Sequence, residues 1–410
     1  MTVFNKAFLS ICLALGSVAA PALAQTTLAE RDIAIALPME SSYLVPASLL
    51  LGQSGVRLFP KQWFDQVNSA FKGSSAGDVL ESESPFEDWQ IVSARITPCN
   101  PLGQNPKQNI TELCWPELRL VWQPILRKVT LHSLFMEAAG EDRAIHAIYP
   151  VEPTLVLNAE ETLRVNNALV AINAGTKTNA KFSSLPSAQM NDFVTLRNRV
   201  TAALLKDTVA LRQMAPSEYV GIGLRPEMLD GKVTSLSFRT AFQGLLQKYA
   251  LPGALRVLTA FSLPEGREPA HLDEWIFLSF KGEAGLITPA PISVVSHTSN
   301  EVLHTTTHVN RGSMRRDDDS FYESADLDIL GESVLLFEMQ REQLLPVLAD
   351  RNQRLVPNTS CIFCHKLNPM RFDLHNFSYL EDRPLTVSPR VVEDVRLDLQ
   401  WIKSHDLSGR

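Results

Sequence analysis

The chain has 410 residues, of which 45% are hydrophobic and 20% charged, a composition typical of a globular protein with a sizeable core. Its formal net charge is −7 at pH 7. This acidic balance argues against nucleic acid or an anionic membrane surface as a partner.

The first 24 residues have the features of an export signal. Lys6 supplies a positive charge, an apolar run extends to Ala20, and small residues precede a predicted cleavage site after Ala24. No later stretch offers 18 consecutive apolar residues, so we expect no transmembrane segment. The sequence predicts an exported, periplasmic protein whose remaining length suffices for two or three domains.

Residues 25–150 are predicted to be a β-rich N-terminal region. The segments 88–98 and 116–125 are rich in β-branched and aromatic residues, which favours strands. A polar loop joins them and has Cys99 at one end and Cys114 at the other. We expect a structural disulfide between these two cysteines, worth about 3 kcal/mol on the chain-entropy description of loop closure.

Residues 151–309 are predicted to be a middle region that contains helices followed by strands. In three segments apolar residues recur at three- and four-residue steps, which predicts helices. Three later segments have the sequence pattern of strands. Because helices and strands come in runs rather than in alternation, the sequence predicts an α+β fold. The helical segments are 159–175, 192–214 and 237–253, and the strand segments are 254–263, 273–281 and 291–299.

A charged, turn-rich stretch at 310–320 marks a predicted boundary, after which residues 320–410 form a mainly helical, cytochrome c-like region. The segment 388–406 begins with Ser-Pro, a favourable helix start, and places Val391, Val395, Leu399 and Ile402 on one helical face. In part of the same segment apolar residues also occupy alternate positions, as they do in a strand. A helix and a strand therefore both stay open, and a helix is favoured.

The motif that bears most directly on function is Cys361-Ile-Phe-Cys364-His365, which has the spacing of a c-type haem attachment site. Two thiols at this distance can form thioethers with the two vinyl groups of one porphyrin, and the next histidine can bind the iron as the proximal ligand. An exported chain with this motif is expected to carry one covalent haem c.

Two other chemistries use the same residues. Cys361, Cys364, His365 and His375 would complete a four-ligand zinc site, although thiols of exported proteins oxidise easily. A simple disulfide within the CxxC pair is the other alternative, but no thioredoxin-like βαβ pattern surrounds it.

The run from Cys361 to Phe377 resembles the haem-binding segment of cytochrome-like domains described from planctomycetes and their relatives. This resemblance implies a c-type cytochrome domain in the C-terminal region and implies nothing about the rest of the chain. Two features depart from the pattern, because one residue fewer separates His365 from Pro369 and because His375 stands where these domains have an acidic residue. The matching residues are Cys361, Cys364, His365, Pro369, Phe372, Asn376 and Phe377.

The sixth iron ligand is predicted to be His375, ten residues after His365, which gives a reach of about 33 Å. Met370 has a reach of only about 17 Å and fits the wall of a haem pocket better. Met339 is the alternative ligand upstream, and His405 is expected to be an exposed histidine of the C-terminal tail.

His304 and His308 form a second histidine pair, which we interpret as ordinary polar strand residues because no HExxH motif accompanies them. The leading functional hypothesis is a monohaem c-type cytochrome that transfers single electrons to or from a redox partner protein. A haem oxidoreductase with an open distal site is one alternative. The other is an envelope interaction module in which a haem or a disulfide is structural.

Overall fold

The computed structural model of the protein describes twenty stretches of the chain and covers most of the two predicted regions before residue 290. They are residues 28–38, 45–46, 50–52, 55–72, 86–101, 113–129, 136–140, 144–177, 185–214, 221–224, 233–262, 276–289, 293–295, 302–304, 309–311, 322–323, 355–356, 377–378, 386–387 and 389–407. Helices and strands are both abundant in them, and the predicted α+β class is confirmed.

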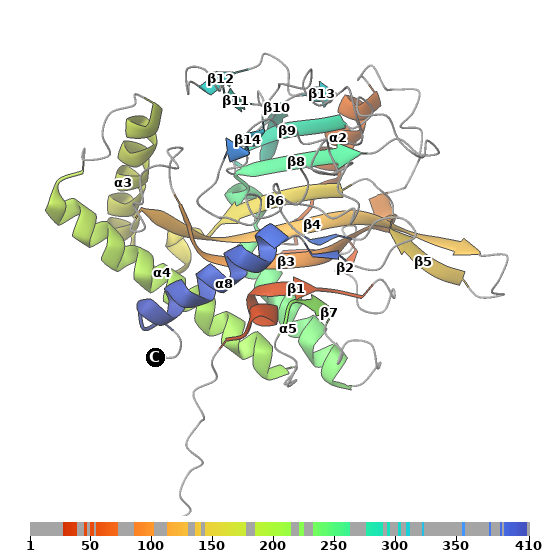
Figure 1. Ribbon diagram of the computed structural model, residues 1–410, viewed down its shortest axis with the longest axis horizontal. Coiled ribbons are helices and arrows are strands. Elements are labelled where there is room, and N and C mark those ends of the chain that lie inside the picture. The colour runs from red at the N-terminus through yellow and green to blue at the C-terminus, as the bar shows by residue number, and fades with distance from the viewer. Residues whose placement is uncertain are drawn as a thin grey trace, which may run out of the picture.

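An 11-stranded sheet forms the centre of the described structure (Figure 1). Its strands are β1 (Ala34–Ala36), β2 (Val45–Pro46), β3 (Trp89–Pro101), β4 (Cys114–Val129), β5 (Met136–Gly140), β6 (Ala144–Pro150), β7 (Gly223–Leu224), β8 (Val257–Ser262), β9 (Ile276–Glu283), β10 (Leu286–Pro289) and β13 (Val309–Arg311). The main path has the order β10-β9-β8-β6-β4-β3-β1-β7, while β13, β2 and β5 pair with β9, β3 and β4. Neighbouring strands are antiparallel except β1 and β7.

This sheet crosses the predicted boundary at residue 150. Strand β8 comes from the predicted middle region and pairs through Val257–Phe261 with β6 from the predicted N-terminal region. The two regions therefore contribute to one sheet and share one hydrophobic core.

The three helices predicted for the middle region are present. They are α3 (Ala159–Lys177), α4 (Ser187–Met214) and α5 (Val233–Tyr249). Helix α4 begins five residues before the predicted start, and its first turn already contributes the partly buried Met190 to the core.

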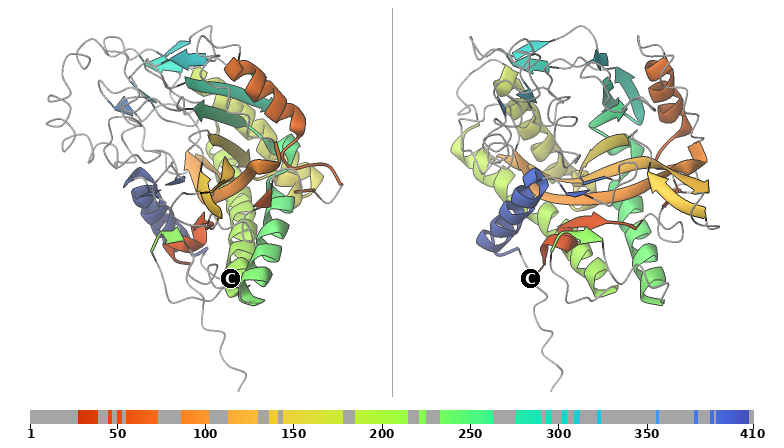
Figure 2. Two further views of the ribbon diagram at one scale, coloured as in Figure 1. Left: turned by 90° about the vertical axis from the view of Figure 1, so that its right-hand side faces the viewer. Right: turned by 45° about the vertical axis from the view of Figure 1, so that its right-hand side comes forward.

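The two faces of the sheet differ in chemistry. Directly opposed residues share a face, and one such set is apolar and buried: Ala94, Ile96, Leu118, Leu120, Trp122, Ile145, Ala147 and Leu258. Helices α4 and α5 lie on one side of the sheet, and a C-terminal helix, α8 (Pro389–Ser404), lies on the other (Figure 2).

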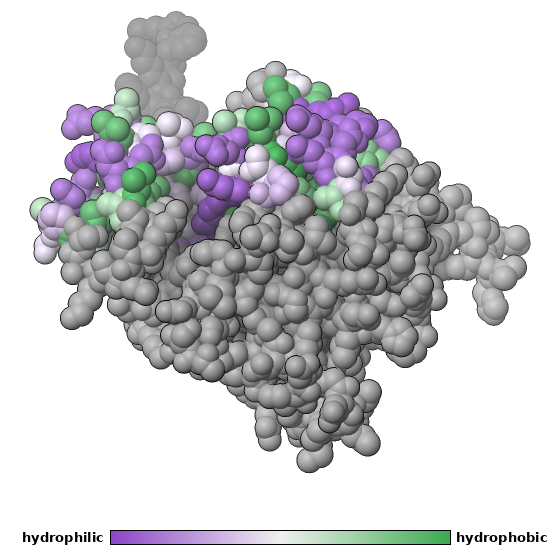
Figure 3. All heavy atoms as spheres, turned by 90° about the horizontal axis from the view of Figure 1, so that it is seen from above, coloured by the Kyte–Doolittle hydropathy of each residue, from purple (hydrophilic) through white to green (hydrophobic). Residues whose placement is uncertain are grey.

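Helix α2 (Lys61–Lys72) is amphipathic and lies at the top of Figure 1, beside β9. Its buried Trp63 donates a hydrogen bond from Nε1 to the carbonyl oxygen of Gly285, at 3.0 Å. Gly285 has φ +83° and follows Ala284 at φ +50°, so the β9–β10 turn places two left-handed residues in succession, which favours glycine. Figure 3 shows the upper surface, where hydrophilic and hydrophobic side chains are interspersed.

Helix α8 confirms the helical interpretation of the C-terminal segment. Val391, Val395 and Ile402 are buried on one face, as the spacing predicts, whereas Leu399 is only partly buried. The helix packs against β3. It ends where Asp406 adopts φ +51° and the Leu407 amide donates to the carbonyl oxygen of Ile402, a left-handed C-terminal cap.

Three short two-strand pairings complete the description. They are β11 (Ser293–Val295) with β12 (Val302–His304), β14 (Tyr322–Glu323) with β15 (Leu355–Val356), and β16 (Phe377–Ser378) with β17 (Thr386–Val387). In the described part of the chain, every helix is too short or too polar to cross a membrane.

Candidate functional site

The residues of the haem motif lie outside the described residues. This applies to Cys361, Cys364, His365 and His375, and also to Met339 and Met370. The structure does describe the strands on either side of the motif, since β15 ends at Val356 and β16 begins at Phe377.

Strand β16 connects the C-terminal side of the motif to the central sheet. It lies against β3 and β4 and pairs with β17, whose last residue is two positions before the start of α8. On the N-terminal side, β15 pairs in parallel with β14, which lies next to β11. The two described strands that flank positions 357–376 therefore each pair with another described strand.

The face of the sheet on which α8 packs against β3 is lined with buried polar side chains. The register pairs Arg95 with Arg119, Thr97 with Glu117, and His146 with Val121. The buried polar residues of this face are Ser93, Arg95, Thr97, Glu117, Arg119, Gln123 and His146. A polar sheet face is usually in contact with water, so this burial requires that charges and hydrogen bonds be satisfied inside the protein.

Glu117 is the centre of one ion cluster on this face. Its carboxylate accepts hydrogen bonds from Arg119 Nε at 2.6 Å, from Arg256 Nη2 at 3.1 Å and from Asn100 Nδ2 at 3.2 Å. Burial raises the pKa of Glu117, but the guanidinium groups of Arg119 and Arg256 outweigh this effect and hold the pKa below its usual value.

Arg95 connects the sheet to α8 through a second cluster. Its Nη1 lies 3.2 Å from Asp394 Oδ2, and its Nη2 lies 3.1 Å from Asp398 Oδ2. The two aspartates are one helical turn apart, so one guanidinium spans both carboxylates. Arg95 and Asp398 are both buried, which makes this pair a specific connection between two segments that are far apart in the chain.

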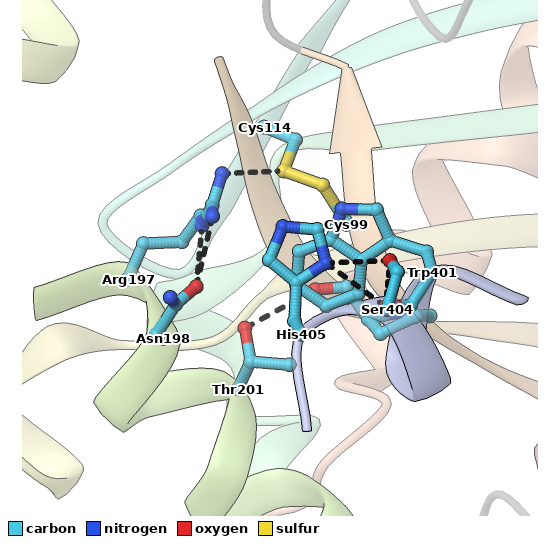
Figure 4. Close-up of a disulfide and its surroundings, with 9 residues drawn as sticks. Cys99, Cys114, Arg197, Asn198, Thr201, Trp401, Ser404 and His405 are labelled. Atoms are coloured by element: carbon cyan, nitrogen blue, oxygen red, sulfur yellow. Dashed lines mark hydrogen bonds between the residues drawn. A yellow bond between two sulfur atoms is a disulfide. The ribbon is translucent and has the colours of Figure 1, made fainter. Parts of the chain in front are cut away.

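The predicted disulfide between Cys99 and Cys114 is present, with Cα atoms 4.9 Å apart (Figure 4). Cys99 lies at an irregularity in the β3–β4 register, and Cys114 opens β4. The buried Arg197 of α4 donates from Nη1 to Cys114 Sγ at 3.2 Å, and its Cζ lies 5.2 Å from the ring centroid of Trp401 in α8.

His405 is predicted to be an exposed residue of the tail, but the structure shows that it is partly buried. Its ring stacks on Trp401 with centroids 4.1 Å apart, and its Nδ1 lies 2.9 Å from the Trp401 carbonyl oxygen (Figure 4). His304 lies on strand β12, in agreement with the strand interpretation, whereas His308 falls outside the described residues.

His146 is a site residue that the sequence analysis does not single out. It lies on β6 between Val121 of β4 and Thr259 of β8, and it is buried on the polar face. The alternation of "AIHAIYP" predicts a strand, but only the pairing with both neighbours shows that the histidine is central in a sheet. Within the described stretches, no group of three or more metal-binding side chains comes together.

Comparisons with known proteins find no family model that matches this chain, and no curated protein or solved structure that is similar to it.

Proposed function

We propose that this protein is an exported, monohaem c-type cytochrome that passes single electrons to or from a periplasmic redox partner. The observation that carries this proposal is the motif Cys361-x-x-Cys364-His365 in a chain that begins with the features of an export signal.

Each residue of the motif has a defined role in this proposal. Cys361 and Cys364 anchor the group covalently, and the His365 imidazole is the proximal iron ligand. Haem c supplies one-electron redox chemistry when it is bound. Thioether anchoring suits a segment that spans only the 20 positions between β15 and β16, because covalent bonds retain a group that a small pocket alone would release.

The connections of this segment also support an electron carrier. Strand β16 lies against β3 and β4 and pairs with β17, which precedes α8, and α8 is joined to β3 by buried charges. A haem bound next to this part of the protein would be in a position to exchange electrons with a docked partner.

The first test is a pyridine haemochrome assay on protein matured together with the cytochrome c assembly machinery. We expect one covalently bound haem per chain, and none in the double variant Cys361→Ala/Cys364→Ala. The matched control is Cys99→Ala/Cys114→Ala, which removes two cysteines elsewhere and should retain the haem. A wild-type protein without haem would refute the proposal and favour the interaction module.

The second test concerns His375 as sixth ligand. Six-coordinate low-spin iron would identify an electron carrier, whereas five-coordinate high-spin iron would favour the haem oxidoreductase. We expect the variant His375→Ala to lose the low-spin absorption spectrum and to gain binding of carbon monoxide. His405→Ala is the control, because the stacking of His405 on Trp401 accounts for its position. An unchanged spectrum in His375→Ala would remove this histidine from the iron and direct attention to Met339.

A further inference from the structure

The last residue of the haem-motif run, Phe377, is among the described residues. It begins strand β16, which lies against β3 and β4 of the central sheet. Strand β16 pairs with β17 over two residues, beginning with Phe377 opposite Val387. A two-stranded pair is at best marginally stable alone, so the place of β16 depends on what β17 is attached to.

Strand β17 is attached to helix α8. Val387 ends the strand, its side chain is partly buried against the hydrophobic core, and α8 begins two residues later at Pro389. The helix itself buries Val391, Val395 and Ile402 and contacts β3. Because the connection is so short, a displacement of α8 also displaces β17.

Arg95 determines where α8 docks on the sheet. Its Nη1 contacts the carboxylate of Asp394 and its Nη2 contacts the carboxylate of Asp398. A shift of the helix by one turn along its axis, about 5.4 Å, would break at least one of these contacts. Apolar contacts are non-directional, whereas a planar guanidinium held by two carboxylates permits few arrangements. Arg95 therefore fixes the position of α8 as well as contributing to its binding.

We propose that Arg95 is a positioning residue for the haem-binding segment, and that it acts through α8, β17 and β16, which dock on the sheet as one unit. This inference rests on the proposed function, because the segment must carry haem for its position to matter. The predicted sixth ligand, His375, precedes Phe377 by two residues, and two residues span at most about 7 Å. The docked position of β16 therefore limits where His375 can bind the iron, and release of the unit weakens that bond.

The test compares wild type with three variants of the full mature protein. Arg95→Lys retains the charge, but a lysine ammonium lacks the planar fork that holds both carboxylates. Arg396→Ala is the matched control on α8, since Arg396 pairs with Glu393 and its side chain is 61% exposed. Leu246→Ala is the control for a general loss of stability, because Leu246 is fully buried in α5, on the opposite side of the sheet from α8 (Figure 2).

Hydrogen exchange measured by mass spectrometry tests the docked unit whether or not haem is bound. In Arg95→Lys we expect the amides of β16, β17 and α8 to exchange faster by a common factor, on the order of tenfold, because one opening event exposes all three elements. Arg396→Ala should change these rates by less than about twofold. Faster exchange in α8 with unchanged exchange in β16 and β17 would overturn the proposal, and so would a pattern identical to that of Leu246→Ala.

The absorption spectrum of the haem-loaded protein tests the consequence for the iron. We expect Arg95→Lys to convert part of the low-spin iron to high-spin iron and to bind carbon monoxide faster by about the same factor as the exchange, since both measure the released unit. Leu246→Ala and Arg396→Ala should retain the wild-type spectrum. A haem-loaded Arg95→Lys protein with an unchanged spectrum would refute this role of Arg95 alone, whereas a wild-type protein without haem would refute the proposed function and this role with it.

Discussion

Replacing Glu117 by alanine is expected to lower the free energy of unfolding by about 3–5 kcal/mol, because it leaves the buried Arg119 guanidinium and the partly exposed Arg256 guanidinium without this carboxylate. Glu117 is 1% exposed, and Arg119 and Arg256 both donate to it. Removing one member of a buried ion cluster costs much more than the cluster contributes as a whole, since the remaining charges keep their desolvation penalty. Chemical denaturation monitored by tryptophan fluorescence would measure this change.

The control for this variant is Glu283→Ala. Glu283 is 77% exposed at its side chain and lies 3.9 Å from Lys281, so its loss should change the free energy of unfolding by less than about 0.5 kcal/mol. Equal effects of the two variants would show that the Glu117 cluster is not a main determinant of stability.

The same cluster predicts a pH dependence with a definite sign. The pKa of Glu117 in the folded protein is below its ordinary value of 4.5. A group of this kind stabilises the protein fully above its unfolded-state pKa, and the stabilisation is lost as the pH falls through the lower folded-state value. We therefore expect the free energy of unfolding, measured from pH 5 downward, to depend less on pH in Glu117→Gln than in wild type.

Asp398→Ala is expected to be similarly destabilising, by about 3–5 kcal/mol, because it leaves one side of the buried Arg95 guanidinium without a carboxylate. The Asp398 side chain is fully buried, whereas the Asp394 side chain is partly exposed. Water therefore cannot take the place of the Asp398 carboxylate as a partner of Arg95. Thermal or denaturant unfolding would measure the effect, and hydrogen exchange would show increased opening of α8.

A surface ion pair on the same helix provides the comparison. Arg396 pairs with Glu393, and its side chain is 61% exposed, so Arg396→Ala should cost no more than about 1 kcal/mol. If Asp398→Ala is no more destabilising than Arg396→Ala, the buried pair does not hold the helix on the sheet.

The local elements of this fold follow from the sequence because they depend on short-range periodicity. Helices α3, α5 and α8 and strands β3, β4, β8 and β9 occur where three- to four-residue steps or β-branched runs predict them. The pairing of Cys99 with Cys114 is also local, since the two residues flank one hairpin loop.

The pairing of strands that are far apart in the chain could not be predicted from sequence periodicity. The pairing of β6 with β8 joins segments on either side of three helices, and no spacing in the sequence encodes it. The buried charges were missed for a related reason. Arg95 and Glu117 have the appearance of ordinary solvent-facing strand residues, and only the tertiary structure shows that both are buried.

The connection between Arg95 and Asp398 also has a consequence for biosynthesis. The two residues are separated by 303 positions, so the strand is synthesised long before the helix that neutralises it. Contacts of such long range form late, because a large loop must close first. A nascent chain therefore lacks the carboxylates that neutralise Arg95 until its last residues are made, and a premature stop before residue 394 yields a product without the acidic helix that packs on β3.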